Sequence, residues 1–132
     1  KRSIKLTLEP IVESSLIAER KMSREMGAVN YFSGIVREGE EGKTIKAINY
    51  EAFDKMVLHQ FDLILNEIEE RWPIESIRLV HRTGTVKVNE SSLWIEVISP
   101  HRTEAFEACQ WLIDEMKKRV PIWKHPIFTK VD

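Results

Sequence analysis

The stretch DKMVLHQFDLILNEIEERWP, residues 54–73, determines the fold class because it predicts a long amphipathic helix. Its large apolar residues recur at spacings of 4, 3, 1, 3 and 4, which is one stripe at the helical period of about 3.6 residues. Asp54 can cap the start, and Pro73 prevents the helix from continuing beyond Trp72. A helix with a single apolar face has to pack on other elements, so the flanking sequence should supply a sheet. The stripe consists of Val57, Phe61, Ile64, Leu65, Ile68 and Trp72.

A second helix is expected over Pro100–Val120, where apolar residues again recur at helical spacing and Pro121 follows as a breaker. A shorter helix is expected to begin at Pro10 and to continue through Ile17, because a proline in the first turn gives up no helical hydrogen bond. The residues of the second helix expected to face inward are Ala105, Phe106, Cys109, Leu112, Ile113 and Met116.

Alternating or β-branched segments between these helices predict strands. The expected strands are Ser3–Leu8, Ala28–Val36, Thr44–Phe53, Ile77–Val88, Ser92–Ser99 and Ile122–Val131. The polar segment Glu38–Lys43 should form the tip of a hairpin joining residues 28–36 to residues 44–53, and Asn89-Glu90 should form a second turn. The order β-α-β-β-α-β-β-α-β predicts one α+β domain over residues 1–132, with helices packed on a largely antiparallel sheet.

The composition excludes several classes of protein. Hydrophobic residues make up 42% of the 132 residues, so the chain can bury a core and is not intrinsically disordered. The 20 Lys and Arg residues balance 21 Asp and Glu residues, which argues against a nucleic-acid partner. No apolar run approaches the ~18 residues that cross a bilayer, so no membrane partner is expected. The single cysteine, Cys109, excludes an internal disulfide and a zinc site built on paired thiolates, and we expect a cytoplasmic protein without metal or cofactor.

The first candidate site is the segment Ser99-Pro100-His101-Arg102, at the start of the second long helix. Serine before proline is typical of a helix start, so His101 and Arg102 should lie in the first turn. Cationic side chains there oppose the helix dipole, which favours anions at this end. A bound phosphate would remove that conflict, because free N–H groups, an imidazole and a guanidinium would converge on it. The alternative is that both side chains are solvated or pair with a carboxylate such as Glu104.

The second candidate is Lys117, near the end of the same helix. Lysines in a last turn are ordinary complements of the helix dipole, and Lys118 has Asp114 four residues before it as an ion-pair partner. Lys117 instead continues the expected inward-facing line through Cys109 and Ile113, so its ammonium group should be partly desolvated. Partial desolvation makes a lysine a better nucleophile or proton donor. A side chain that extends to water is the alternative.

Two further basic residues are candidates, and one histidine is interpreted as structural. Arg37 closes the apolar segment 30–36 just before the polar tip, where an exposed arginine without a function is the alternative. Lys124 follows Trp123 on an extended segment, where alternation should point it to one side of a sheet. His81 ends an apolar strand and is assigned a structural role. The residues by themselves indicate a basic, phosphate-sized site that contains one or two lysines.

Several short motifs occur in a fixed order from Gly27 onward. They are Gly27-Ala28-Val29 with Gly34-Ile35-Val36-Arg37, Tyr50-Glu51-Ala52, Arg71-Trp72-Pro73, His81-Arg82-Thr83-Gly84, Ser99-Pro100-His101-Arg102 with Ala105-Phe106-Glu107-Ala108, and Lys117 followed by Val120-Pro121-Ile122-Trp123-Lys124. Together they resemble the MoaE family, the large, catalytic subunit of molybdopterin synthase. The chain departs from the family pattern at His125-Pro126, where a basic and an acidic residue are usual.

The resemblance implies an α/β-hammerhead-type fold and a homodimer that binds one ubiquitin-like small subunit at each end, giving a heterotetramer. The Gly-Gly tail of the small subunit carries a thiocarboxylate. Two sulfurs pass from this tail to cyclic pyranopterin monophosphate (precursor Z) and form the dithiolene of molybdopterin. The protein would thus be a sulfurtransferase with Lys117 and Lys124 as its catalytic residues. The residues implied to bind the substrate and its phosphate are Arg37, His101, Arg102 and His125.

Two alternatives come from other functional classes. A non-catalytic module could bind a ubiquitin-like tail or a phosphorylated metabolite, but simple anion capture does not need a lysine that emerges from an apolar stripe. A phosphate-ester hydrolase could use His101 and Arg102, but the sequence offers no obvious metal-ligand set or activated nucleophile for it. An assay for the dithiolene product discriminates the synthase from both.

Overall fold

The computed structural model describes residues 1–129, and within them the chain forms eight strands and three helices. The last expected strand ends at Phe128, and residues 130 and 131 of that prediction lie outside the described residues. No helix in residues 1–129 is long and apolar enough to span a membrane. In chain order, the elements are β1 (Arg2–Thr7), α1 (Glu13–Ala18), β2 (Ala28–Ile35), β3 (Gly39–Glu40), β4 (Lys43–Ala52), α2 (Asp54–Arg71), β5 (Ser76–Arg82), β6 (Gly84–Lys87), β7 (Ser91–Ser99), α3 (Arg102–Arg119) and β8 (Ile122–Phe128).

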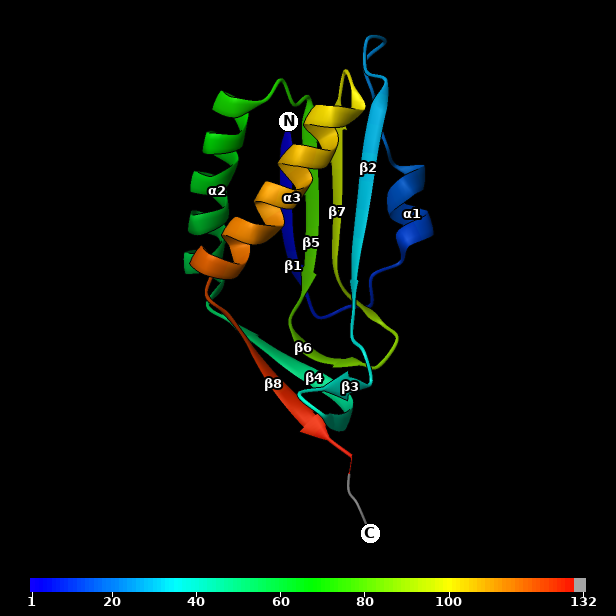
Figure 1. Ribbon diagram of the computed structural model, residues 1–132, viewed down its shortest axis with the longest axis vertical. Coiled ribbons are helices and arrows are strands. Elements are labelled where there is room, and N and C mark those ends of the chain that lie inside the picture. Colours follow the sequence, from blue (N-terminus) through cyan, green and yellow to red (C-terminus); the bar gives the residue numbers. More distant parts are fainter. Residues whose placement is uncertain (130–132) are drawn as a thin grey trace.

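The strands form two sheets, and the second lies below the first in Figure 1. The first sheet has the order β1-β5-β7-β2, in which β1 is parallel to β5 and the other neighbours are antiparallel. The second sheet has the order β3-β4-β6, and β8 also pairs with β4, all antiparallel. The expected α+β class with largely antiparallel strand pairing is confirmed.

The main core lies between the first sheet and the two long helices, α2 and α3, which cover the same face of that sheet (Figure 1). Ile77 and Leu79 of β5 pack in this core. Arg78, between them, points to the other face and donates a 2.7 Å hydrogen bond to the carbonyl oxygen of Leu16, so α1 lies on that side. Full burial of a large apolar side chain contributes about 1.5–3 kcal/mol, which makes this core the main source of stability. Its fully buried members include Phe61, Ile64, Ile68, Leu79, Ile95 and Leu112.

The expected hairpin between residues 28–36 and residues 44–53 is wrong. β2 pairs along its length with β7, from Ala28 opposite Ser99 to Ile35 opposite Ser91, whereas β4 pairs with β6 and β8. Only the short β3 folds back on the start of β4. A hydrophobic period indicates which face of a strand is buried, but it does not indicate which distant strand is the neighbour.

The expected strand Ile77–Val88 is also wrong, because it is two strands that belong to different sheets. β5 ends at Arg82 and β6 begins at Gly84, whose φ of 78° lies in the left-handed region that glycine adopts without strain. This break takes the chain from the first sheet to the second. The expected turn at Asn89-Glu90 is confirmed, with Asn89 at φ 73°.

Helix α1 begins later than expected, at Glu13 rather than at Pro10. Val12 precedes it in an extended conformation, with φ −102° and ψ 93°. Ile11 and Val12 are β-branched and have low helix propensity, so Pro10 does not open a helix here.

Helix α3 also begins later than expected, at Arg102, with His101 rather than Ser99 as its N-cap residue. The Ser99 hydroxyl instead donates a 2.6 Å hydrogen bond to the carbonyl oxygen of His101. Phe106, which was expected to face inward, is 59% exposed. The buried residues of this helix are Ala105, Ala108, Cys109, Leu112 and Met116.

Candidate functional site

A cavity of about 800 Å³ lies where the two sheets meet the last turns of α3. Small-molecule sites commonly occupy about 300–1,000 Å³, so this cavity can hold a bicyclic or tricyclic metabolite. Its walls come from β2 and the residues after it, and from β4, β5, β7, α3 and β8. Its ionisable side chains are Arg37, Glu40, Tyr50, His81, Lys117 and Lys124.

Lys117 reaches the cavity because of its phase on α3. Ile113, four residues earlier, and Met116, the preceding residue, line the same cavity, and Met116 is buried. Lys117 itself is exposed, so the expectation that its ammonium group is partly desolvated is wrong. Lys118 points away and pairs with Glu115 at 3.4 Å, which corrects its expected pairing with Asp114.

Lys124 reaches the cavity through the register of β8 on β4. It lies opposite Tyr50, and both side chains line the cavity. His125, the next residue, lies opposite Asn49, and successive side chains of a strand point to opposite faces. Its Nε2 atom is 3.0 Å from a carboxylate oxygen of Glu51. The structure therefore separates His125 from the cavity that holds Lys124.

Arg37 completes a group of three cationic side chains at the cavity. It directly follows Val36, which is almost fully buried at 2% exposure and anchors the chain where it leaves β2. Within residues 1–129, none of Arg37, Lys117 and Lys124 forms an ion pair, whereas nearby Arg119 is paired with Glu67. Three cations face only one carboxylate, that of Glu40, so the cavity suits an anion.

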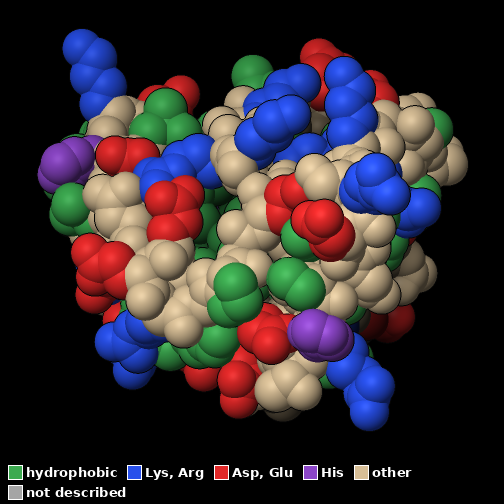
Figure 2. All heavy atoms as spheres, turned by 90° about the horizontal axis from the view of Figure 1, so that it is seen from above, with side chains coloured by type: hydrophobic (Ala, Val, Ile, Leu, Met, Phe, Trp, Pro, Cys, Tyr) green, Lys and Arg blue, Asp and Glu red, His purple; other side chains and the backbone are tan. Residues whose placement is uncertain are grey.

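His101 and Arg102 lie at the opposite end of α3. The axial distance from Arg102 to Lys117 is about 22 Å at 1.5 Å per residue. Both side chains are exposed, and Figure 2, which looks onto this end of the molecule, shows basic and acidic side chains intermixed. Within one protomer the structure thus brings together Arg37, Lys117 and Lys124, but not His101 or Arg102.

His81 and Tyr50 also line the cavity, although neither is among the site residues predicted from the sequence. His81 is 5% exposed and belongs to the row of β5 side chains that starts with Ile77 and Leu79. Its ring lies edge-on to that of Tyr50, with centroids 5.2 Å apart and an interplanar angle of 75°. Burial lowers the pKa of the imidazole and raises that of the phenol, so both rings are neutral near pH 7. The alternation of β5 places His81 on the same face as the core residues, which indicates burial but does not distinguish the wall of a cavity from a core.

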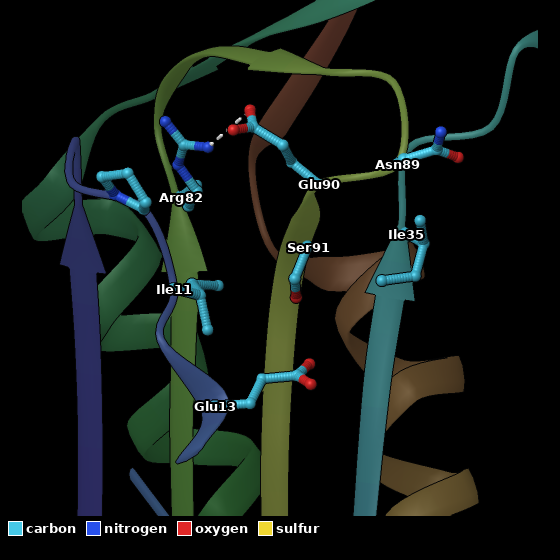
Figure 3. Close-up of a pocket in the computed structure, with 8 residues that line it drawn as sticks. Ile11, Glu13, Ile35, Arg82, Asn89, Glu90 and Ser91 are labelled. Carbon is cyan, nitrogen blue, oxygen red and sulfur yellow. Dashed lines mark hydrogen bonds and ion pairs between the residues drawn. The ribbon is translucent and has the colours of Figure 1, made fainter. Parts of the chain in front are cut away.

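A second, smaller cavity of about 280 Å³ lies on the α1 side of the first sheet (Figure 3). Arg82 is its only lining cation, and its guanidinium pairs with Glu90 at 3.2 Å. Glu13 contributes a further carboxylate. Because its one cation is neutralised, this cavity is a poorer candidate for an anionic substrate than the larger one.

Comparisons with known proteins agree with this geometry. A model of the MoaE protein family matches residues 6–119. The molybdopterin synthase catalytic subunit 1 of Aedes aegypti is 41% identical over 122 residues, which are 92% of this chain and 78% of that protein. The crystal structure of molybdopterin synthase from Staphylococcus aureus superimposes with a TM-score of 0.86 at 33% identity, over 96% of this chain and 92% of that one.

The fold also matches a chain in a protein–protein complex of subunits 1 and 2 of the molybdopterin-converting factor from Helicobacter pylori. The TM-score is 0.76 at 20% identity, over 98% of this chain and 90% of that one. The family match covers most of the described residues, and the sequence similarity to the mosquito enzyme extends over nine-tenths of the chain. The chain belongs to the MoaE family, as the order of its motifs indicates.

Proposed function

We propose that this chain is the catalytic subunit of a molybdopterin synthase. It would transfer two sulfurs in succession to precursor Z, one from each of two thiocarboxylated tails of the ubiquitin-like small subunit. The observation that carries the proposal is the convergence of Arg37, Lys117 and Lys124 on one cavity, where Glu40 is the only carboxylate among the lining residues. We place the reaction in the cytoplasm, a compartment in which a cysteine without a disulfide partner, such as Cys109, is usual.

The arrangement supports sulfur transfer between two anions. A thiocarboxylate and a cyclic phosphate repel each other, and fixed positive charge lowers the free energy of bringing them together. Lys117 and Lys124 approach the cavity from different elements, α3 and β8, so they can face opposite sides of a bound substrate. Each ammonium group can donate a proton to a substrate oxygen, which then leaves as water, and the guanidinium group of Arg37 can bind an anionic group.

The proposed partner is the small subunit, whose extended tail would enter the cavity. This chain shares the fold of one chain in the Helicobacter pylori complex, which contains two subunits of a molybdopterin-converting factor. With a formal net charge of −1, the chain as a whole offers little long-range attraction, so insertion of the tail should carry the specificity. Removal of the last two residues of the partner is therefore expected to abolish turnover, and undiminished turnover would contradict the proposed tail path.

A second copy of the chain is proposed to supply His101 and Arg102 to the cavity. β2 is an edge strand, and Ile35, at its cavity end, is 50% exposed. At its other end, Gly27 donates a 3.1 Å hydrogen bond to the carbonyl oxygen of Pro100, next to the start of α3. Antiparallel pairing of two β2 strands about a two-fold axis would bring the start of one α3 beside the cavity of the other copy. The phosphate would then meet cations from both copies.

The test is a product assay with the purified protein, thiocarboxylated small subunit and precursor Z. Formation of the dithiolene is the expected result, and the small subunit without its thiocarboxylate is the control. A tight complex without any product would contradict the proposal and favour the non-catalytic binding module.

A further inference from the structure

His81 presents a nitrogen to the cavity whose hydrogen-bonding role can be assigned. Its Nδ1 atom is 2.7 Å from the carbonyl oxygen of Arg82. A carbonyl oxygen only accepts hydrogen bonds, so Nδ1 carries the hydrogen. In the neutral ring, Nε2 is then the nitrogen with the free lone pair. Within residues 1–129, Nε2 has no hydrogen-bond partner, and the ring forms part of the cavity wall.

The orientation of this ring is fixed from two sides. The Tyr50 ring packs against it edge-on, and the Arg82 carbonyl holds Nδ1. Arg82 is itself immobilised on the other face of β5, where its guanidinium donates to the carbonyl oxygens of Leu8 and Thr85 and pairs with Glu90 (Figure 3). Because these contacts fix the end of β5 and the plane of the His81 ring, the lone pair of Nε2 points in one direction.

Besides His81, the uncharged acceptors of this cavity are the hydroxyl groups of Ser33, Tyr50 and Ser92, and those of Ser33 and Ser92 already bond within the protein, to Ser91 and to the Gly34 carbonyl oxygen. Arg37, Lys117 and Lys124 carry only donors, and Glu40 is the only carboxylate. Burial lowers the pKa of His81, so the ring remains neutral, with its acceptor available, at physiological pH. The three cations complement phosphate oxygens, whereas a neutral nitrogen lone pair complements an N–H or O–H group.

We propose that Nε2 of His81 binds the substrate by accepting a hydrogen bond from an N–H group of its pterin ring system. The inference rests on the proposed function and deepens it, because it divides the cavity into two parts. The cations hold the anionic groups, and His81, on the wall formed by β5, recognises the heterocycle. His81 is thus a specificity-determining residue, which fixes the orientation of the ring relative to Lys117 and Lys124.

The test compares the affinity for precursor Z of the wild type and His81→Asn, measured by calorimetry on the complete chain. The asparagine amide can still donate to the Arg82 carbonyl, but it provides nothing at the position of Nε2. Loss of one neutral hydrogen bond should raise Kd about 2- to 12-fold, which corresponds to roughly 0.5–1.5 kcal/mol. In turnover, KM should rise by a similar factor while kcat changes less. His59→Asn, on the exposed face of α2, is the matched control and should leave both values unchanged.

The pH dependence provides a second readout. Protonated His81 has donors only, so wild-type affinity should fall as the pH decreases below 6.5 through the lowered pKa of the ring. The other ionisable groups that face the cavity are Arg37, Glu40, Tyr50, Lys117 and Lys124. His81→Asn retains all of them, so the difference between the two pH curves isolates the histidine. The difference should disappear toward low pH, where the wild type also lacks the acceptor.

Equal affinities and parallel pH curves for the two proteins would overturn the inference. Loss of small-subunit binding together with substrate binding would also overturn it, because it would indicate a structural role. If His81→Asn is unstable, His81→Gln and His81→Met are compared instead, because the two side chains have similar length. The glutamine amide oxygen can accept the hydrogen bond and methionine offers only a weak acceptor, so only His81→Gln should retain affinity. Failure of the wild type itself to bind precursor Z would instead refute the proposed function.

Discussion

Lys117 and Lys118 are adjacent in sequence, but their surroundings differ. Lys117 lines the cavity, whereas Lys118 is 72% exposed and pairs with Glu115. Loss of a catalytic charge or proton donor typically lowers a rate by about 10²–10⁴-fold. Lys117→Ala should therefore lose nearly all dithiolene formation, while Lys118→Ala stays within a few-fold of the wild type. The product assay measures both.

Controls for this pair come from stability and from a conservative substitution. Both variants should keep the wild-type melting temperature and the complex with the small subunit, because neither side chain belongs to the core. Lys117→Arg should restore activity only in part, since a guanidinium keeps its charge but does not give up a proton near neutral pH. An inactive Lys118→Ala beside an active Lys117→Ala would contradict the assignment.

The candidate residues could be named from sequence, but their grouping could not. Helical phase and strand alternation pointed to Lys117 and Lys124, and the structure places both at one cavity. Strand alternation by itself puts His125 and Lys124 on opposite faces of β8, but the family resemblance grouped them in one site, and the register with β4 shows that they are separated. His81 was assigned a structural role, because a buried histidine that lines a cavity and one enclosed in a core have the same sequence pattern.

The junction between β2 and α3 depends on close approach of two backbones at Gly27. A Cβ atom at this position would lie 2.9 Å from the carbonyl oxygen of Pro100, which is backbone and cannot rotate away. Gly27→Ala should therefore destabilise the protein by about 1–3 kcal/mol, as overpacking does. Thermal unfolding measures the loss. Gly39→Ala is the control, because a Cβ there meets nothing within 4 Å, and its stability should stay near that of the wild type.

At the scale of elements, local patterns predicted what each segment forms but not which segments pair. The α2 stripe predicted its buried face, since Val57, Phe61, Ile64, Leu65 and Ile68 are all buried. The pairing of β2 with β7 is a contact between distant segments, and no local period encodes it. The change of sheet at Gly84 was missed for a related reason. A single glycine at a strand end indicates a break without indicating where the chain goes next.

At the scale of the whole molecule, His101 and Arg102 lie too far from the cavity of their own chain to bind the same substrate as Lys117. If they bind the phosphate, a second copy of the chain has to supply them. Arg102→Ala removes a charge-assisted hydrogen bond to phosphate, which contributes about 1.5–3 kcal/mol. Affinity for precursor Z should therefore decrease roughly 10- to 100-fold, with fold and dimer retained. Calorimetry against the wild type measures the change, and an unaltered affinity would remove Arg102 from the site.

A cavity completed by residues of a second copy predicts recovery of activity in a mixture of two inactive variants, whereas a cavity built from one chain does not. Arg102→Ala retains Lys117, and Lys117→Ala retains Arg102, so a dimer of one copy of each has one cavity with both residues and one cavity with neither. Equal mixing with free exchange gives heterodimers in about half of the molecules. Roughly one-quarter of the wild-type activity should then return when precursor Z is kept well below its KM, where Arg102→Ala alone is nearly inactive. The two variants are mixed, dissociated, reassociated and assayed for the product. The control is a mixture of Lys117→Ala with the double variant Lys117→Ala/Arg102→Ala, in which every cavity lacks Lys117. A cavity that used His101 and Arg102 of its own chain would give no recovery, because every chain in the mixture then lacks one required residue.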